Sequence, residues 1–379
     1  MSNAVIVGYA RSPFTIANKG ELIRVRPDDL AAQVVRGLLD RTRIDADAIE
    51  DLILGCAFPE GEQGFNVARL IGMIAGLPRS VAGTTVNRWC GSSMQAVHMA
   101  AGAIALGSGQ AFIAAGVESM TRVPMMGFNP MPNPTLAEKD PGAYMSMGIT
   151  AENLAAKYGI ARTEQEAFAV RSHHKAAAAQ AAGRFDDEIV AIRTPDGALV
   201  VRDGGIRAEA SVESLATLKP AFNAQGSVTA ATSSPLTDGA SATLVVSEEF
   251  ARAHGLKILA RIRSTAVAGC DPTIMGIGPV PASRKALQRA GIEVKDLSVI
   301  ESNEAFSVQA LSVARELGFD EAKVNLDGGA LALGHPLGAT GARITGKAAA
   351  LLKREGGQFA LATQCIGGGQ GIATVLEAV

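Results

Sequence analysis

The chain has 379 residues, which is enough for two or three domains with sizeable cores. Its 35 Lys and Arg residues nearly balance 37 Asp and Glu residues, so charge gives no reason to expect nucleic acid or a membrane surface as the main partner. Aromatic residues make up 4% of the chain whereas glycine numbers 42, a composition that suits closely packed helices on sheets and argues against a base-stacking surface.

The four cysteines lie far apart and form no Cys-x-x-Cys pair, so neither a disulfide framework nor a zinc site is expected. Reduced thiols in a cytoplasmic protein fit this spacing best. Residues 4–8 form a strand-like run with no cationic lead or cleavage site, and no apolar stretch is long enough to span a bilayer. We therefore expect a cytoplasmic protein without a membrane span.

Strands and helices alternate up to about Glu118. The pattern predicts strands at 5–8, 52–54 and 112–116, and helices over 27–41 and 92–106. Alternation of this kind is typical of a largely parallel, layered α/β sheet.

Cys90 lies where a β-branched run at 84–87 leads into the helix over 92–106. The free N–H groups and the dipole of a helix start stabilise an anion, so we expect a lowered thiol pKa and a better nucleophile. The small residues Gly91 and Ser92 would let a substrate carbonyl approach the sulfur. The alternative is that Cys90 is only a small buried hydrophobe.

Between 119 and about 234 the alternation is lost. Proline-rich pieces at 124 and 130–134 precede a polar helix over 164–182 and irregular segments. An insertion of this length usually carries binding function, although a solvated linker with small helices of its own is the alternative. Strand-like sequence resumes at 242–246 and 258–262.

The last third of the chain repeats the first. Matching positions recur at a constant offset of about 248, and they are Ile44, Ile49 and Leu52 with Ile292, Leu297 and Ile300. This spacing predicts a duplicated α/β domain and not a solenoid, whose period would be far shorter. Two copies packed back to back would bring strand ends from both halves toward one cleft.

Three motifs of the second half could supply reactive groups there. Pro336 holds His335 in an extended backbone at a helix entrance, where a neutral imidazole could activate a thiol. Cys365 ends a strand and precedes three glycines whose N–H groups could donate to an oxyanion. Asn303 follows a strand at 299–301 and could orient a water or a substrate oxygen. The structural alternatives are a turn histidine, a flexible hairpin and a helix N-cap.

Four segments resemble the signature blocks of thiolases, in order and at the expected separations. They are 87–96 (Asn-Arg-Trp-Cys-Gly-Ser-Ser-Met-Gln-Ala), 303–306 (Asn-Glu-Ala-Phe), 329–338 (Gly-Ala-Leu-Ala-Leu-Gly-His-Pro-Leu-Gly) and 365–371 (Cys-Ile-Gly-Gly-Gly-Gln-Gly). Within the family the chain resembles the degradative 3-ketoacyl-CoA thiolases of fatty-acid β-oxidation. The resemblance implies a thiolase fold: a duplicated α/β domain in five layers (αβαβα), with an N-terminal half at 1–258, an inserted loop domain at about 119–234, and a C-terminal half at 259–379.

The resemblance implies an acyltransferase, acetyl-CoA C-acyltransferase, that cleaves 3-ketoacyl-CoA with CoA into acetyl-CoA and a shortened acyl-CoA, and also runs the reverse Claisen condensation. By position, Cys90 would carry the acyl group as a thioester, His335 would activate it, and Cys365 would shuttle a proton. Asn303, through a water, and His335 would line one oxyanion hole, and the N–H groups of Cys90 and Gly367 the other. Coenzyme A is then a co-substrate, and neither a cofactor nor a metal is implied.

By position, the CoA contacts implied by the resemblance are Ser146, Met147, Arg207, Ser214, Phe222, Ala230, Ser234, Met275, Ala305 and Phe306. Arg207 would serve the nucleotide end, and Phe222 and Phe306 the pantetheine arm. Short-chain biosynthetic relatives carry histidine at the position of Ser146, which argues against an acetyl-specific site.

Three further departures concern assembly and the acyl pocket. Residues 125–140 lack the longer loop that forms tetramers in those relatives, so a homodimer is at least as plausible as a homotetramer. Trp89 and Gln364 are unusual beside the two cysteines and could reshape the pocket. A hydratase or dehydrogenase subunit of β-oxidation is a possible partner.

Three other functions stay open. An acetoacetyl-CoA thiolase (acetyl-CoA C-acetyltransferase) would run the same chemistry on a two-carbon acyl group. A non-catalytic acyl-CoA-binding scaffold subunit would leave both cysteines and the histidine unexplained. A cysteine hydrolase using Cys90 and His335 would have no need for Cys365.

Overall fold

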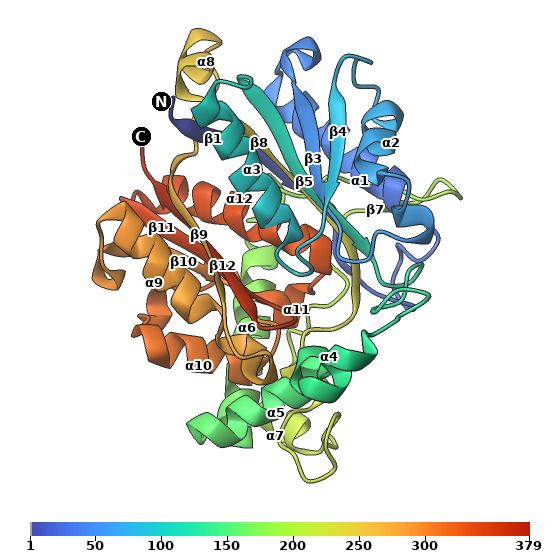
Figure 1. Cartoon of the computed structure of the whole chain (residues 1–379), viewed down its shortest axis with the longest axis vertical. Helices are drawn as coiled ribbons and strands as arrows, with labels where there is room; N and C mark the ends of the chain where they lie inside the picture. The colour runs from blue at the N-terminus through green and yellow to red at the C-terminus, as the bar shows by residue number, and fades with distance from the viewer. Residues whose placement is uncertain (1) are drawn as a thin grey trace.

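The computed structural model describes residues 2–379. Its main sheet has the strand order β10-β11-β12-β9-β1-β8-β5-β3-β4, with β2 beside β8 (Figure 1). The strands are β1 (Ala4–Arg11), β2 (Thr15–Ile16), β3 (Asp51–Gly55), β4 (Ala82–Val86), β5 (Ala111–Ser119), β8 (Thr237–Ser247), β9 (Ala260–Gly269), β10 (Leu297–Ser302), β11 (Phe359–Ile366) and β12 (Gln370–Glu377).

This sheet consists of two copies of one pattern. In the N-terminal copy, β4, β3 and β5 are parallel, and β8 then pairs antiparallel with both β5 and β1. In the C-terminal copy, β10 and β11 are parallel and β12 pairs antiparallel with both β11 and β9. Val324 bridges Ile300 in parallel, at the place that β4 takes beside β3. The predicted duplication is confirmed.

The prediction of a largely parallel sheet was wrong, because the sheet is mixed. A parallel neighbour needs a crossover connection, whereas β12 follows β11 through a tight hairpin and must therefore run antiparallel to it. Within residues 2–379, strands of the two copies pair with each other only where β1 meets β9, at Val5 with Arg261 and Ile6 with Ala260.

Helices complete the layers on both sides of the sheets and between them. α3 (Ser92–Leu106) and α12 (Leu337–Glu355) lie side by side between the two copies and contact strands of both (Figure 1). α1 (Pro27–Thr42) and α2 (Val67–Ile74) pack on the N-terminal copy, while α9 (Pro279–Ala290) and α10 (Ser307–Leu317) cover the C-terminal copy. The predicted five-layered fold follows from this arrangement.

The two central helices approach each other closely because small residues face each other between them. A Cβ at Gly341 would lie 2.2 Å from the backbone nitrogen of Met94, so α12 tolerates only glycine at this position. The Ser93 hydroxyl accepts a hydrogen bond from the N–H of Ala342 at 2.8 Å. α3 has the predicted bounds, and it ends where Gly107 takes a left-handed conformation with φ of 76°.

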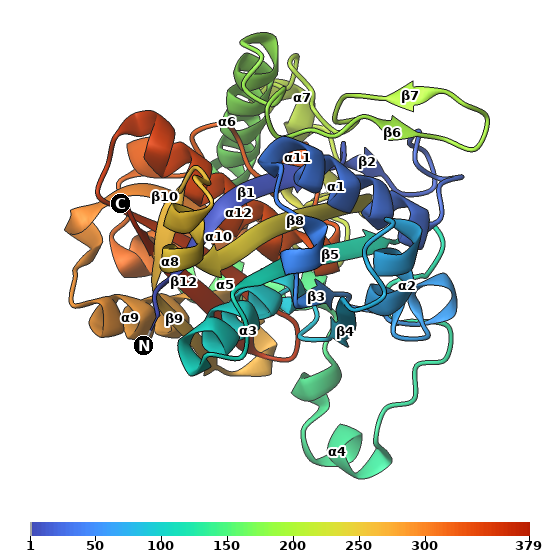
Figure 2. The ribbon, with the colours of Figure 1, turned by 90° about the horizontal axis from the view of Figure 1, so that it is seen from above.

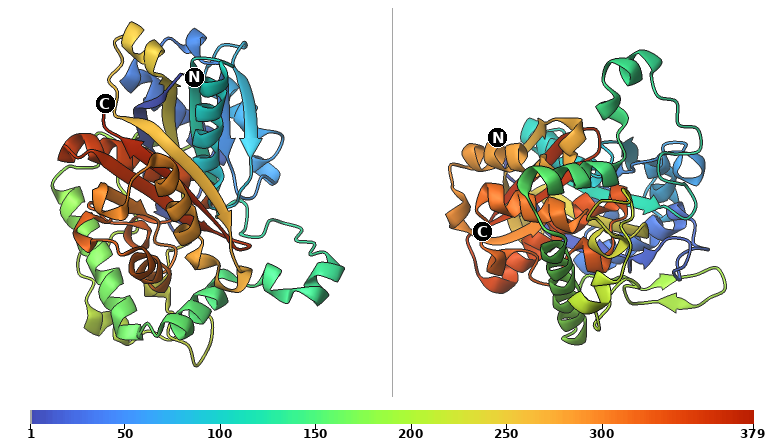
Figure 3. Two further views of the ribbon diagram at one scale, coloured as in Figure 1. Left: turned by 60° about the vertical axis from the view of Figure 1, so that its left-hand side comes forward. Right: turned by 90° about the horizontal axis from the view of Figure 1, so that it is seen from below.

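The segment between β5 and β8 is folded, so it is more than a linker. It holds α4 (Pro134–Lys139), α5 (Met147–Tyr158), α6 (Arg162–Ala181), the β6 (Ile192–Arg193) and β7 (Leu199–Val200) pair, and α7 (Val212–Ala216). α6 contacts α10 and α11 (Ala330–Leu333), which belong to the C-terminal copy. α4 sits on an arm that extends from the body (Figures 2 and 3). The predicted domain boundaries remain a prediction.

Short elements complete the chain. They are α8 (Glu248–Ala253) and the 3₁₀ turns η1 (Ala46–Ala48), η2 (Gly61–Gln63), η3 (Pro141–Tyr144), η4 (Ala230–Thr232), η5 (Pro272–Ile277), η6 (Val294–Asp296) and η7 (Glu321–Lys323). Within residues 2–379, no helix has the length and apolar character needed to cross a membrane.

Candidate active site

Cys90 sits in a tight turn between β4 and α3. The Asn87 side chain accepts a hydrogen bond from the N–H of Trp89, and Trp89 adopts a left-handed backbone with φ of 43°. A bulky residue rarely takes this conformation, so the turn is held by its surroundings. Gly91 is the N-cap of α3, which places the Cys90 sulfur directly before the helix start, as the sequence predicted.

The Trp89 ring lies on the glycine hairpin that connects β11 and β12. A Cβ at Gly367 would come within 2.9 Å of this ring, and one at Gly368 within 2.7 Å. The indole is still 39% exposed. Trp89 thus forms a cover over the backbone next to the nucleophile, and both glycines are needed for the ring to lie so close.

Cys90 lines a cavity of about 390 Å³ whose wall is rich in methionine. Three of the predicted CoA contacts, Ser146, Met147 and Met275, line the same cavity, together with Gly367. The other lining residues are Phe58, Trp89, Met125, Met126, Pro130, Met131, Pro132, Gly142, Ala143, Tyr144, Met145, Pro272, Leu337 and Gly368. Flexible, polarizable methionine side chains can adapt to apolar chains of different shape.

The expectation of a lowered thiol pKa was wrong. Burial raises the pKa of Cys90 to about 11, although the backbone N–H groups of Gly367 and of Cys90 itself stabilise the thiolate and act in the opposite direction. Only 3% of the residue is exposed, so the loss of solvation outweighs the helix start. The resting sulfur is therefore a neutral thiol that needs a base.

Cys365 is close to Cys90. It lies on β11 just before the hairpin, and its pKa is raised well above the ordinary value by burial and then by the charge that the neighbouring Cys90 carries once it ionises. The N–H of Gly367, two residues further on, reaches the Cys90 sulfur. The structure thus brings Cys90, Cys365 and Gly367 together. An N–H group beside the sulfur is suited to stabilise negative charge that forms there.

His335 is fixed at the entrance of α12 by two hydroxyl groups. Its backbone N–H donates to Thr237 at 3.0 Å, and its Nδ1 lies 2.6 Å from the Thr340 hydroxyl. Thr340 donates its only proton to the carbonyl of Pro336 at 3.0 Å, so its oxygen accepts the Nδ1 proton and Nε2 is left without one. Burial lowers the pKa of His335 to about 3, which keeps the ring neutral.

Asn303 faces the free nitrogen of His335. Its Nδ2 is 3.4 Å from His335 Nε2, while its Oδ1 is buried and has no hydrogen-bond partner among the described residues. The alternative of a helix N-cap is wrong, since Phe306 holds that position at the start of α10. A buried amide with an open oxygen is suited to hold a water or a substrate group.

Residues next to Asn303 and His335 in the chain contact the segments that carry the two sulfurs. The N–H of Asn303 donates to the carbonyl of Thr363 at 2.9 Å, two residues before Cys365 on β11. Leu337, two residues after His335, packs against Cys90 in one apolar cluster. Cys90, Asn303, Cys365 and Gly367 therefore lie at strand ends of the two copies, where such sheets place their sites, and His335 lies beside Asn303 at the entrance of α12.

The remaining predicted CoA contacts fall into two groups. Ala305 and Phe306 pack with Cys365 and Met275, and Phe222 meets Phe306 edge-on with ring centres 6.0 Å apart. Ser234 donates its N–H to the carbonyl of Ala305 at 2.9 Å, and Ala230 begins η4 a few residues earlier.

Arg207 and Ser214 lie further out, on the exposed surface of the insert. Neither is among the residues that line the Cys90 cavity, and Ser214 caps α7 together with Ser211. Their role in CoA binding remains a prediction.

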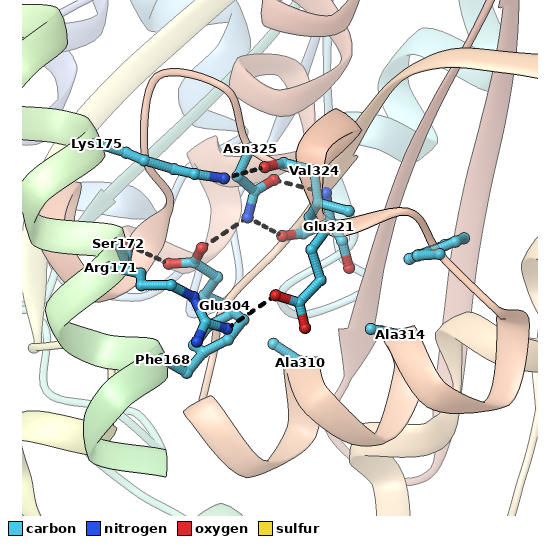
Figure 4. A pocket seen from close by; sticks show the side chains of 12 residues that line it. Phe168, Arg171, Ser172, Lys175, Glu304, Ala310, Ala314, Glu321, Val324 and Asn325 are labelled. Carbon is cyan, nitrogen blue, oxygen red and sulfur yellow. Dashed lines mark hydrogen bonds and ion pairs between the residues drawn. The ribbon is translucent and has the colours of Figure 1, made fainter. Parts of the chain in front are cut away.

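Sequence reasoning missed the buried carboxylate of Glu304, which follows Asn303 directly. Glu304 accepts hydrogen bonds from Ser172 at 2.6 Å and from Asn325 at 2.7 Å (Figure 4). It also accepts one from the N–H of Leu331 at 3.2 Å. It thereby ties α6 to the loop that leads to His335. It also lines a cavity of about 40 Å³ formed by α6, α10 and nearby loops. The signal was its place directly after Asn303, since a charged residue in an apolar strand end needs buried donors.

Two family models cover nearly the whole chain. The thiolase N-terminal domain model matches residues 4–249, and the thiolase C-terminal domain model matches residues 256–378. The chain belongs to the thiolase family. Its thiolase fold and the duplicated architecture expected from the sequence are thereby confirmed.

Curated thiolases resemble the chain over its entire length. The 3-ketoacyl-CoA thiolase of Bacillus subtilis (strain 168) is 50% identical over 389 residues, and that of Shewanella sp. (strain MR-7) is 53% identical over 392 residues, with 100% of each chain covered. Human mitochondrial 3-ketoacyl-CoA thiolase has a crystal structure that matches with a TM-score of 0.91 and 35% identity, covering 100% of this chain and 99% of that one. A structure of the human enzyme in complex with CoA matches equally well, covering 98% of that chain.

Proposed function

We propose that this thiolase is a 3-ketoacyl-CoA thiolase, an acetyl-CoA C-acyltransferase that cleaves 3-ketoacyl-CoA with coenzyme A and acts in fatty-acid β-oxidation. The observation that carries the proposal is that Cys90 and Gly367 line one cavity and that the buried Cys365 lies next to Cys90. The names of full-length relatives at about half identity support the same reaction.

Acylation begins with attack of Cys90 on the 3-keto carbon. Because the Cys90 thiol and the His335 imidazole are both neutral at rest, the proton leaves the sulfur only as the carbon–sulfur bond forms, with His335 Nε2 as the base. The N–H groups of Cys90 and Gly367 stabilise the oxyanion that develops. The bond between carbons 2 and 3 then breaks, which leaves the shortened acyl chain on Cys90.

The departing fragment is the enolate of acetyl-CoA, and it must be protonated at carbon 2. Cys365 is the thiol that supplies this proton, and Asn303 with His335 holds the enolate oxygen. Coenzyme A then gives its thiol proton to the Cys365 thiolate and attacks the Cys90 thioester. The Cys90 thiolate leaves and regains its proton from His335, so no proton or electron is left over. CoA is a co-substrate in this scheme, and no cofactor takes part.

The apolar cavity wall favours an acyl substrate longer than two carbons. Met125, Met126, Met131 and Met145 surround the space next to Cys90, and the exposed fractions of Met126 and Met131 are 51% and 82%. An acyl chain would bury this apolar surface and gain about 0.8 kcal/mol per methylene. The second candidate, acetoacetyl-CoA thiolase, would leave the wall uncovered.

The exposed edge of the sheet supports a homodimer. β4 is the edge strand of the N-terminal copy, so one row of its backbone groups has no neighbouring strand among the described residues. Beside it lie the exposed apolar side chains of Phe65, which is 94% exposed, and of Leu70, Met73 and Ile74 from α2. A second copy of the chain paired along β4 would cover both features.

Light scattering tests the larger assemblies. The homotetramer and a β-oxidation hydratase or dehydrogenase subunit remain alternative partners, which light scattering of the purified protein alone and in a mixture would separate. All four cysteines are free, and the cytoplasmic location that their spacing suggested remains a prediction.

The test of the proposed function is a covalent adduct followed by turnover. Incubation with a 3-ketoacyl-CoA of eight to sixteen carbons, chosen to span medium and long chains, is expected to add one acyl group to Cys90 by intact mass. Free CoA should then discharge it as acyl-CoA. Cys90→Ala should show neither step. A catalytic efficiency that is highest for acetoacetyl-CoA would favour the acetyltransferase instead, and release of free acid without CoA would favour a hydrolase.

A further inference from the structure

The two copies of the fold place different residues at equivalent strand ends. In the N-terminal copy the β3–β5 register ends with Gly55 opposite Gly116, and in the C-terminal copy the β10–β11 register ends with Ser302 opposite Thr363. Cys56 and Asn303 each follow the last paired residue of their own strand, and Glu118 and Cys365 each lie two residues beyond it on the neighbouring strand. Beyond the last pair, the C-terminal copy thus carries the proposed proton shuttle and the N-terminal copy carries a carboxylate.

Glu118 is completely buried and is held only by neutral donors. The N–H groups of Ala57 and Gly338 reach its Oε2 at 2.8 Å each, and the Gln63 amide reaches its Oε1 at 2.9 Å. The N–H of Phe58 donates to Oε1 at 3.3 Å. Within residues 2–379, no lysine, arginine or histidine forms an ion pair with Glu118. A buried carboxylate is stable in such a place only because several N–H groups replace its water.

Two of these donors belong to, or lie next to, residues that pack against Cys90. Cys90 packs in a small apolar cluster with Ala57, Met120 and Leu337. Glu118 binds the N–H of Ala57 directly, binds that of Gly338 next to Leu337, and lies two residues before Met120. One carboxylate therefore binds two of the three segments that pack on Cys90, one from each copy of the fold, and lies two residues before the third.

Close packing around Glu118 leaves no space for a side chain at Gly338, in the first turn of α12. A Cβ at Gly338 would lie 2.8 Å from its carboxylate oxygen and 2.8 Å from the Cα of Cys56. The first turn of α12, which follows His335 and Pro336, is thus pressed against this carboxylate. A displacement of the carboxylate would move the Leu337 wall and the start of the helix that carries the base.

We propose that Glu118 is a positioning residue of the thiolase reaction: it fixes the Ala57 turn and the start of α12 so that Cys90 and His335 keep the geometry needed for acylation. The proposal rests on the proposed function. Glu118 lies outside the lining of the Cys90 cavity, so its action passes through the residues that it holds and not through substrate.

The carboxylate cannot be replaced by an amide without loss. Glutamine would turn one of the two acceptor oxygens into an N–H₂ donor, which would face the N–H groups of Ala57 and Gly338 or of Phe58 and Gln63. Aspartate keeps both acceptors but is shorter by one methylene. The two variants therefore separate the number of acceptors from their reach.

The experiment measures the acylation rate constant of Cys90 at saturating 3-ketoacyl-CoA in a single turnover, read by quenching and intact mass. We expect Glu118→Gln to lower this constant about 30-fold per folded molecule, while the half-saturating substrate concentration stays within threefold. Glu118→Asp should recover part of the rate. Loss of stability alone would lower the amount of active protein and the Tm but not the rate constant of the folded fraction.

Glu152→Gln is the matched control. Glu152 on α5 also accepts backbone N–H groups, those of Ser227 and Val228 at 2.9 Å each, but it lies in the insert. Its substitution should lower the Tm and leave the acylation rate constant within twofold.

An acylation rate constant for Glu118→Gln within twofold of the unsubstituted protein would overturn the proposal. If this variant does not fold, Glu118→Asp decides: a rate constant at least fivefold lower at an unchanged half-saturating concentration supports it, and an unchanged rate constant overturns it. Failure of the proposed function looks different, because the unsubstituted protein itself would then form no adduct.

Discussion

The strand ends of the N-terminal copy and those of the C-terminal copy share one backbone pattern but differ in how their polar groups are satisfied. Glu118 has four N–H donors on its two oxygens, and the Cys56 sulfur also lies 3.7 Å from it. At the equivalent place in the C-terminal copy, the Asn303 Oδ1, the Ser302 hydroxyl and the Gln364 Oε1 are buried without a partner among the described residues.

This difference indicates that the two copies have different roles at the site. Groups whose hydrogen-bonding capacity is filled by the protein cannot bind substrate, but they can fix the backbone around them. Groups with open capacity can accept a water, a proton or a substrate oxygen. The C-terminal strand ends supply the chemistry in our proposal, and the N-terminal strand ends hold the nucleophile turn in place.

Removal of one cysteine from each set of strand ends should give the largest contrast. Cys365→Ala removes the proton shuttle, so we expect thiolysis and condensation to fall by roughly 10⁴-fold, while Cys90 still takes an acyl group from a simple acyl-CoA. Cys56→Ala lies at the N-terminal strand ends, where the polar groups already have hydrogen-bond partners, and it should retain activity within about fivefold. Rates of carbon–carbon cleavage and adduct formation by mass measure both. Normal turnover by Cys365→Ala would refute the shuttle assignment.

A smaller loss of activity is expected for Asn303, whose amide oxygen has no hydrogen-bond partner among the described residues. Asn303→Ala removes one donor from the proposed enolate site, which should lower kcat by about 10²- to 10³-fold. Because the Cys90 oxyanion site is separate, acyl transfer from an acyl-CoA to Cys90 should change by less than about tenfold. Equal losses in both reactions would show that Asn303 only supports the fold. Steady-state and single-turnover kinetics of the two reactions, with a Tm for each variant, provide the comparison.

The pH dependence of alkylation tests the burial of the nucleophile. With a thiol pKa of about 11, the thiolate fraction of Cys90 is small at neutral pH and rises with pH. Its reaction with iodoacetamide in the substrate-free enzyme should therefore accelerate about tenfold per pH unit between pH 7 and 9. Peptide mapping assigns the modified cysteine. A rate that levels off below pH 8 would mean that the helix start outweighs burial after all.

The smallest effect is expected at Gln364. Its amide donates to the carbonyl of Cys90, but its oxygen is buried without a partner. Gln364→Met removes a favourable bond and an unsatisfied oxygen together, each of about 1 kcal/mol, so the two changes should nearly cancel. We expect a Tm within about 3 °C and a kcat within about fivefold. A much larger loss would give this amide a direct part in acylation.

The sequence predicted the parts of the site that depend on local order. The turn at Cys90, the helix bounds of α3, the hairpin after Cys365 and the helix entrance at His335 all follow from residues adjacent in the chain. It failed where distant segments decide the outcome. The raised pKa of Cys90 comes from burial, and the role of Glu118 emerges only when residues 57 and 338 are seen beside it.

The junction between the two copies has a consequence for how the chain reaches its native state. In the described part of the chain, the strands of the two copies meet at only two residue pairs, whereas α3 and α12 bury their sides against each other. Either copy made alone would expose a glycine- and alanine-rich helix to water. The halves should therefore be unable to fold separately, and the ribosome must release most of the polypeptide before the first half becomes stable.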